Sequence, residues 1–158
     1  MIVLGIDPGV ERIGFAVLSN SKHQSKNINY LHSGIIITAK NSKKEQRFLT
    51  IYNDIQKVVA KYRPNCLILE EIFYSKNVKT ATSVAQAQGV IYLLAGQLNL
   101  PLYTLTPNSI KLAVTGYGNA DKRAVQKMVT LQLAIPKKKR LDDEYDAIAC
   151  AFSHLLIN

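Results

Sequence analysis

The stretch Ile2-Val3-Leu4-Gly5-Ile6-Asp7-Pro8-Gly9 decides the fold of this chain, because an almost unbroken apolar run ends abruptly in a carboxylate and a turn. Apolar runs of this kind are typical of strands that are covered on both faces. A charge at the end of such a strand lies where open α/β sheets place their ligands. We therefore expect a sheet with a functional site at the edge where Asp7 lies.

Two more acidic groups follow the same pattern. Glu70 and Glu71 come directly after the apolar run 67–69, and the segment 142–146 reads Asp-Asp-Glu-Tyr-Asp ahead of a helical apolar stripe. Each group has a plain structural alternative, since Asp-Pro-Gly is a good turn and a strand can simply leave the core through two glutamates. Three such groups in an otherwise basic chain favour convergence on one metal-dependent site.

The acidic residues of the last helix divide into two kinds. Asp143 and Asp146 are three positions apart and Asp142 and Asp146 four, so each pair shares a helix face. For Asp142 and Glu144 we favour a structural role, in which Asp142 caps the helix and its neighbours complement the helix dipole. Asp146 lies a turn inside the helix beside the apolar stripe, which favours a functional role.

Composition and charge indicate a single basic domain. The 158 residues include 20 Lys and Arg against 11 Asp and Glu, a formal net charge of +9. This length suits one domain over residues 1–158, and the charge favours phosphate-rich partners or acidic membranes. The basic run Lys137–Arg140 is interpreted as a DNA-facing loop that neutralises nearby phosphates.

Targeting signals point to the cytoplasm. The first residues lack the basic and long apolar regions of a secretory signal, and no run approaches the ~18 apolar residues of a membrane span. Cys66 and Cys150 lie in apolar surroundings without metal-binding spacing, so they are expected to be buried free thiols in a reducing compartment. We expect a cytoplasmic protein with no membrane association.

Periodicity and turn residues predict an α/β protein with a mixed central sheet and helices on both faces. The predicted order is βββαβαβααα. The strands are expected at 2–7, 13–19, 30–38, 66–70 and 101–105, and the helices at 43–62, 79–98, 107–115, 120–134 and 142–157.

Electrostatics then predicts the chemistry. Two carboxylates ~4 Å apart repel by ~4 kcal/mol at an effective dielectric of ~20, so four in one cleft cannot all ionise without bound cations. Carboxylate oxygens select Mg²⁺ or Mn²⁺ over zinc. Two such ions ~4 Å apart can flank a phosphodiester. The residues alone therefore predict a divalent-metal phosphodiester hydrolase.

The chain also resembles the RuvC family of Holliday-junction resolvases, in order and nearly end to end. The matching motifs are Gly5-Ile-Asp7-Pro-Gly9 with Gly14, Leu69-Glu70-Glu71 through Asn77, Ala87-Gln-Gly89, Gly116 through Lys122, and Asp143-Glu-Tyr-Asp146-Ala-Ile-Ala. The resemblance implies a ribonuclease-H-like fold, Mg²⁺ dependence, and a homodimer that nicks two opposed strands of four-way junction DNA. It also implies cooperation with the RuvA–RuvB branch-migration complex.

The resemblance further implies which residues do the work. It places the four acidic metal ligands on Asp7, Glu70, Asp143 and Asp146, and so favours Glu70 over Glu71 and Asp143 over Asp142. The residues implied to contact DNA are Phe73, Lys76, Asn77, Lys111 and Lys122. For Phe73, stacking on bases near the crossover competes with a role as a packing anchor.

Three other functions are compatible with parts of the sequence. A sugar-kinase or actin-like ATPase also begins with a Gly-Ile-Asp-x-Gly strand, but it needs two domains that 158 residues cannot hold. A noncatalytic junction-binding protein would keep the lysines without needing four placed acids. A related nuclease that cuts RNA or RNA–DNA hybrids is the third alternative. Only a substrate test distinguishes it from a DNA nuclease, because nothing in the sequence indicates directly which sugar is recognised.

Overall fold

The computed structural model describes residues 1–21, 27–71 and 78–158. The order of elements is the predicted one, with boundaries that differ by one to two residues. The elements are β1 (Ile2–Asp7), β2 (Arg12–Asn20), β3 (Ile28–Ile37), α1 (Lys44–Tyr62), β4 (Cys66–Glu70), α2 (Val78–Gln97), β5 (Leu102–Leu105), α3 (Pro107–Thr115), α4 (Lys122–Gln132) and α5 (Asp142–Ile157).

The five strands form one mixed sheet in the order β3-β2-β1-β4-β5. Strand β1 pairs antiparallel with β2 and parallel with β4, and Ile6 lies opposite Leu69 in the parallel register. The parallel register brings the carboxyl ends of β1 and β4 to the same edge of the sheet. Asp7 and Glu70 are the last residues of these two strands, so the chain delivers two carboxylates to that edge.

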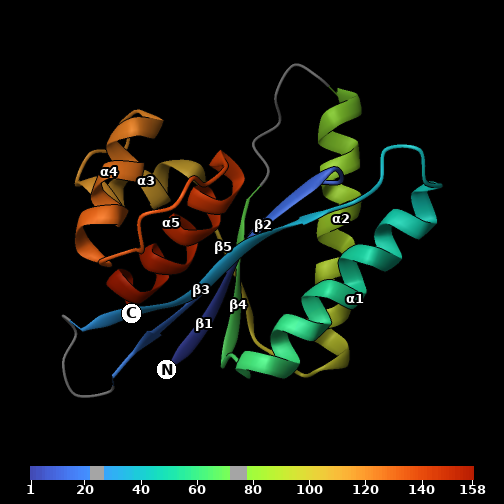
Figure 1. The fold of residues 1–158 in the computed structure, drawn as a ribbon, viewed down its shortest axis with the longest axis horizontal. Helices are drawn as coiled ribbons and strands as arrows, with labels where there is room; N and C mark the ends of the chain where they lie inside the picture. The colour runs from blue at the N-terminus through green and yellow to red at the C-terminus, as the bar shows by residue number, and fades with distance from the viewer. Residues whose placement is uncertain (22–26, 72–77) are drawn as a thin grey trace.

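Helices cover both faces of the sheet, as predicted (Figure 1). Helices α3, α4 and α5 lie on one face, and α1 and α2 lie on the other. The alternation of side chains along each strand feeds two separate cores. In β1, for example, Val3 contributes to the core under α5 and Leu4 to the core under α1 and α2.

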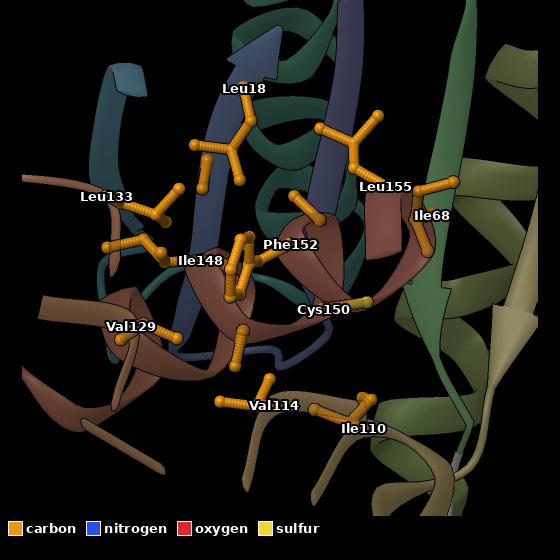
Figure 2. Close-up of a cluster of buried hydrophobic side chains, with 14 of the residues drawn as sticks. Leu18, Ile68, Ile110, Val114, Val129, Leu133, Ile148, Cys150, Phe152 and Leu155 are labelled. Carbon is orange, nitrogen blue, oxygen red and sulfur yellow. The ribbon is translucent and has the colours of Figure 1, made fainter. Parts of the chain in front are cut away.

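Helix α5 is the most deeply buried helix on its face. Its apolar side chains point into a cluster between the sheet and helices α3 and α4 (Figure 2). Ile148, Phe152 and Leu155 are each at most 3% exposed. Cys66 and Cys150 are buried and free, which confirms the expected thiols. Burial on this scale fixes the position of α5 and of the acidic residues at its start.

Two glycines let α5 approach the sheet closely. A Cβ at Gly14 in β2 would collide with the carbonyl oxygen of Asp143, and a Cβ at Gly5 in β1 would lie 2.5 Å from the carbonyl oxygen of Ala147. Ala151 is the next residue of α5 to meet Gly5. Small residues at these two strand positions therefore allow the first turns of α5 to lie directly on β1 and β2.

Within the ranges that the structure describes, no helix is both long and apolar enough to span a bilayer.

Candidate active site

Four carboxylates gather where β1, β4 and α5 meet. Asp7 and Glu70 end the two neighbouring parallel strands, while Asp143 and Asp146 lie in the first two turns of α5. The side-chain amide of Gln88 in α2 donates a hydrogen bond of 2.8 Å to the carbonyl oxygen of Glu70, which ties the end of β4 to α2. The structure thus brings together the four acids that the sequence predicts.

Two cavities open beside these acids. The smaller, of about 230 Å³, is lined by Glu70 and Asp146 together with Lys111 and Lys122. The larger, of about 680 Å³, is lined by Asp7 and Asp143 and by residues of the β1–β2 turn, α1 and α2. Glu71 is exposed and lines neither cavity.

Burial, together with neighbouring carboxylates, raises the pKa values of three of these acids, Asp7, Glu70 and Asp146. Burial and the charges of Glu70, Asp146 and Asp143 raise the pKa of Asp7 to about 8. Burial and the charge of Asp146 raise the pKa of Glu70 to about 7. The pKa of Asp146 is also raised, chiefly by burial, although Lys122 acts in the opposite direction. Partly buried carboxyl groups with raised pKa values are typical of functional sites.

Two of the acids have cationic partners. The guanidinium Nε of Arg12 lies 3.3 Å from Asp143 Oδ2, and Lys122 Nζ lies 2.7 Å from Asp146 Oδ2. Burial opposes the charge on Lys122, but hydrogen bonding to Asp146 and the charges of Asp146 and Asp142 outweigh it and raise the lysine pKa. Among residues 1–21, 27–71 and 78–158, no three His, Cys, Asp or Glu side chains are arranged to hold a metal ion.

The donor set nevertheless fits a hard divalent cation. All four groups offer carboxylate oxygens, the donors that Mg²⁺ and Mn²⁺ prefer. Burial and neighbouring carboxylates raise the pKa values of Asp7 and Glu70, so the ionised forms of these groups are disfavoured in the protein alone. A bound divalent cation would supply the missing positive charge.

The predicted DNA-contacting residues fall into two groups. Lys111 in α3 and Lys122 at the start of α4 both line the smaller cavity, so the structure places them beside Glu70 and Asp146. Phe73, Lys76 and Asn77 lie outside the described residues.

The predicted cap of α5 is wrong. The N-cap position belongs to Leu141, which makes no side-chain capping hydrogen bond, and Asp142 is the first helical residue. Asp142 is exposed, accepts a hydrogen bond of 3.2 Å from the side chain of Gln126, and lies 3.5 Å from Lys122 Nζ. It therefore joins α5 to α4, and the three acids of the first turn still complement the helix dipole.

Glu144 is more than a dipole residue, because it is the centre of a buried polar network. It is 4% exposed, accepts a hydrogen bond of 2.5 Å from Ser33 Oγ of β3, and forms ion pairs of 2.9 Å with Lys138 and 3.2 Å with Arg140. The Arg140 side chain is only 2% exposed. The interpretation of Lys137–Arg140 as a DNA-facing loop is therefore wrong for Arg140, which faces the interior.

Sequence reasoning missed two contributors to the site. Arg140 and Glu144 are four residues apart, but Arg140 lies before the start of α5, so helical spacing gave no signal for their ion pair. Nothing local to Arg12 indicated its partner, because Asp143 lies more than a hundred residues away in the chain. Such a contact depends on where α5 packs.

Comparison with known proteins agrees with this geometry. A family model described as crossover junction endodeoxyribonuclease RuvC matches residues 3–154. The chain is 41% identical over 152 residues to the crossover junction endodeoxyribonuclease RuvC of Thermosipho melanesiensis, covering 96% of this chain and 95% of that protein. It is 37% identical over 155 residues to that of Fusobacterium nucleatum, covering 98% and 80%.

A solved structure has the same fold. The structure described as T. thermophilus RuvC in complex with Holliday junction substrate superposes with a TM-score of 0.92 at 28% identity, covering 99% of this chain and 94% of that one. The fold is the ribonuclease-H-like α/β fold that the resemblance implied. With four carboxylates at the expected sheet edge and relatives matched over nearly their whole length, the chain belongs to the RuvC family of crossover junction endodeoxyribonucleases.

Proposed function

We propose that this protein resolves four-way DNA junctions by paired, metal-dependent nicks in opposed strands, with Asp7, Glu70, Asp143 and Asp146 as its catalytic metal ligands. Membership of the RuvC family makes it a crossover junction endodeoxyribonuclease that acts in DNA recombination and repair. The observation that carries the residue assignment is the gathering of four acids between two cavities lined with cationic side chains.

The roles of the acids follow from their positions. Asp7 and Glu70 sit on the ends of rigid paired strands, and Asp143 and Asp146 sit on a helix whose other face is buried. Such supports hold ligand oxygens in place better than loops do. Lys111 and Lys122 border Glu70 and Asp146, so they would hold the phosphates of the strand being cut. Phe73, Lys76 and Asn77 complete the proposed DNA contacts.

Nucleases of this family are metal-dependent. We propose Mg²⁺, with Mn²⁺ as a substitute and two ions per site, because the donors are carboxylate oxygens only. When bound, such ions would activate water and stabilise the charge of the leaving oxygen, which yields 5′-phosphate and 3′-hydroxyl ends. The protein's own part is to orient the ions and to position the phosphodiester over them.

The assembly is part of the same proposal. Two opposed strands need two active sites, so a homodimer of one-domain protomers (residues 1–158) accounts for paired nicks. The family resemblance also suggests that the RuvA–RuvB branch-migration complex delivers the junction, and that the protein acts in the cytoplasm. The net charge of +9 supports binding to DNA.

A cleavage assay with three labelled substrates tests the proposal. A synthetic four-way junction, a linear duplex and an RNA–DNA hybrid would each be incubated with the protein in Mg²⁺, in Mn²⁺ and in chelator. We expect symmetric nicks in the junction alone, and none in chelator. Equal cutting of the hybrid would overturn the junction preference, and cutting that survives chelation would overturn the metal requirement.

A further inference from the structure

The larger cavity beside the acids contains a cationic wall that the proposed function leaves unused. It lies between the turn after β1, the start of α1 and one side of α2, and has a volume of about 680 Å³. Its basic residues are Arg12, Lys44 and Arg47. A cavity of this size is within the usual range for ligand sites.

Two of these three cations lack a carboxylate partner among residues 1–21, 27–71 and 78–158. Three acids line the cavity: Asp143 is paired with Arg12, Glu11 is paired with Lys40 at 3.3 Å, and Asp7 is paired with neither Lys44 nor Arg47. Within the part of the chain that the structure describes, neither Lys44 nor Arg47 forms an ion pair with a carboxylate, and segments 22–26 and 72–77 contain no Asp or Glu. The cavity therefore presents two cations that no described carboxylate pairs with directly.

The arginine is held in place before any ligand arrives. Arg47 Nε donates a hydrogen bond of 2.8 Å to Thr38 Oγ1, and the Thr38 hydroxyl donates one of 2.5 Å to the carbonyl oxygen of Val10 in the cavity wall. The Nη2 atom of Arg47 is buried and has no hydrogen-bond partner in the described chain. Because Arg47 lines the cavity, a phosphate bound there would be a suitable acceptor for its guanidinium.

We propose that Lys44 and Arg47 bind backbone phosphates of the cleaved DNA strand on one side of the cleaved bond, opposite to the side held by Lys111 and Lys122. This inference rests on the proposed function and adds a second half to its DNA path. Asp7 and Asp143 line this cavity, whereas Glu70 and Asp146 line the cavity of the two lysines. A DNA strand that runs across the four acids would therefore contact Lys44 and Arg47 on one side of them and Lys111 and Lys122 on the other.

Binding measurements on two neighbouring lysines test the charge. Lys44→Gln removes a cation that lines the cavity, and Lys43→Gln removes an exposed cation beside it that does not. Junction affinity would be measured by fluorescence anisotropy over a series of salt concentrations, in Ca²⁺ to prevent cutting. Loss of one phosphate contact should lower the slope of log K against log salt by about 0.9 in Lys44→Gln, with no change in Lys43→Gln.

Neutral methylphosphonates placed singly along the cleaved strand test the side. In the full-length wild-type protein, each contacted phosphate should lose affinity when neutralised. In Lys44→Gln, a methylphosphonate should no longer lower the affinity at positions on one side of the cut. In Lys111→Gln, it should no longer lower the affinity at positions on the other side. Arg47→Lys keeps the positive charge but removes the guanidinium. It should weaken binding of the phosphates on the same side of the cut as those that contact Lys44. Its melting temperature shows whether the variant folds.

The possible outcomes separate this inference from the proposed function. If the wild-type protein neither binds nor cuts the junction, the proposed function fails. If the wild-type protein does both, the proposed function stands. The inference about Lys44 and Arg47 is then refuted if Lys44→Gln has the same salt dependence as Lys43→Gln. It is also refuted if the methylphosphonate effect vanishes at the same positions in Lys44→Gln and Lys111→Gln.

Discussion

Asp146 is paired with Lys122 and is also a proposed metal ligand. Its Oδ2 atom lies 2.7 Å from Lys122 Nζ, and burial raises its pKa. A divalent ion bound by this carboxylate would weaken its hold on Lys122. The lysine would then be available for a DNA phosphate on the same wall of the smaller cavity.

Replacing Asp146 with asparagine should separate cutting from binding. Asp146→Asn removes a proposed metal ligand and also the partner of Lys122, so nicking should fall by at least a hundredfold while junction affinity stays equal or rises. Cleavage rates and anisotropy on the same junction measure the two effects. Asp54→Asn, a matched change on α1, should alter neither. A variant that still nicks at the full rate would remove Asp146 from the site.

The pKa values of Asp7 and Glu70 predict how stability depends on pH. Their folded-state values of about 8 and about 7 lie above the ordinary values of 3.8 and 4.5, so the metal-free folded protein keeps protons that the unfolded chain releases. The stabilisation that these retained protons give to the folded state is complete below about pH 4. It is lost progressively as pH rises from there through the folded-state values of about 7 and about 8. In chelator, the contribution of these two groups to the melting temperature should therefore fall between about pH 4 and about pH 8.

Asp7→Asn and added Mg²⁺ provide the controls for that measurement. The variant should flatten the decline, because asparagine does not titrate. Mg²⁺ binds the ionised carboxylates, so it should raise the melting temperature more at pH 8 than at pH 6. A wild-type decline that the variant reproduces in full would assign the effect to other groups.

At the scale of elements, the close contact of α5 with the sheet sets the geometry of the site. Gly14→Ala should push the start of α5 away from β2, because the new Cβ would collide with the carbonyl oxygen of Asp143. We expect a loss of about 1–3 kcal/mol of unfolding free energy, typical of overpacking, and a larger fall in cleavage than in binding. Urea denaturation and cleavage rates measure both.

A glycine elsewhere serves as the matched control. Gly96 lies in α2, where an added Cβ meets nothing within 4 Å. Gly96→Ala should leave stability unchanged or raise it by up to about 1 kcal/mol. If Gly14→Ala behaved like Gly96→Ala, the tight contact between α5 and β2 would not be needed.

The network around Glu144 anchors the start of α5 to β3. Glu144→Gln would leave the Arg140 guanidinium, whose side chain is 2% exposed, without its carboxylate. Breaking a buried pair from one side costs about 3–5 kcal/mol, so urea denaturation should show a loss of that order. Replacing both residues, as in Arg140→Met with Glu144→Leu, should cost less than the single change. Equal losses would indicate that the charge pair is not the cause.

At the scale of the whole molecule, the excess of basic residues predicts steep salt dependence. With a net charge of +9, phosphate contacts should release counterions on binding, so junction affinity should fall linearly on a plot of log K against log salt. Four or more contacts would give a slope of about −3.6 or steeper. Anisotropy titrations measure it, and a flat response would contradict a DNA-binding surface.

Local sequence information was enough for the elements. The apolar run before Asp7 and the patterns that predict helices at 43–62 and 107–115 each depend on residues close together in the sequence, and the structure confirms all three elements. The acid-tipped strands β1 and β4 also predicted which sheet edge would carry charge, since parallel neighbours end on the same side.

Long-range packing determined the rest. The partner of Arg12 and the burial of Arg140 both depend on how α5 packs on the sheet. This packing joins segments more than a hundred residues apart in the chain. The spacing of apolar residues indicates which face of a helix or strand a residue occupies. It does not indicate which residues of other elements pack against that face. A side chain's charge partner, and hence its pKa and role, is therefore set only when the layers are packed together.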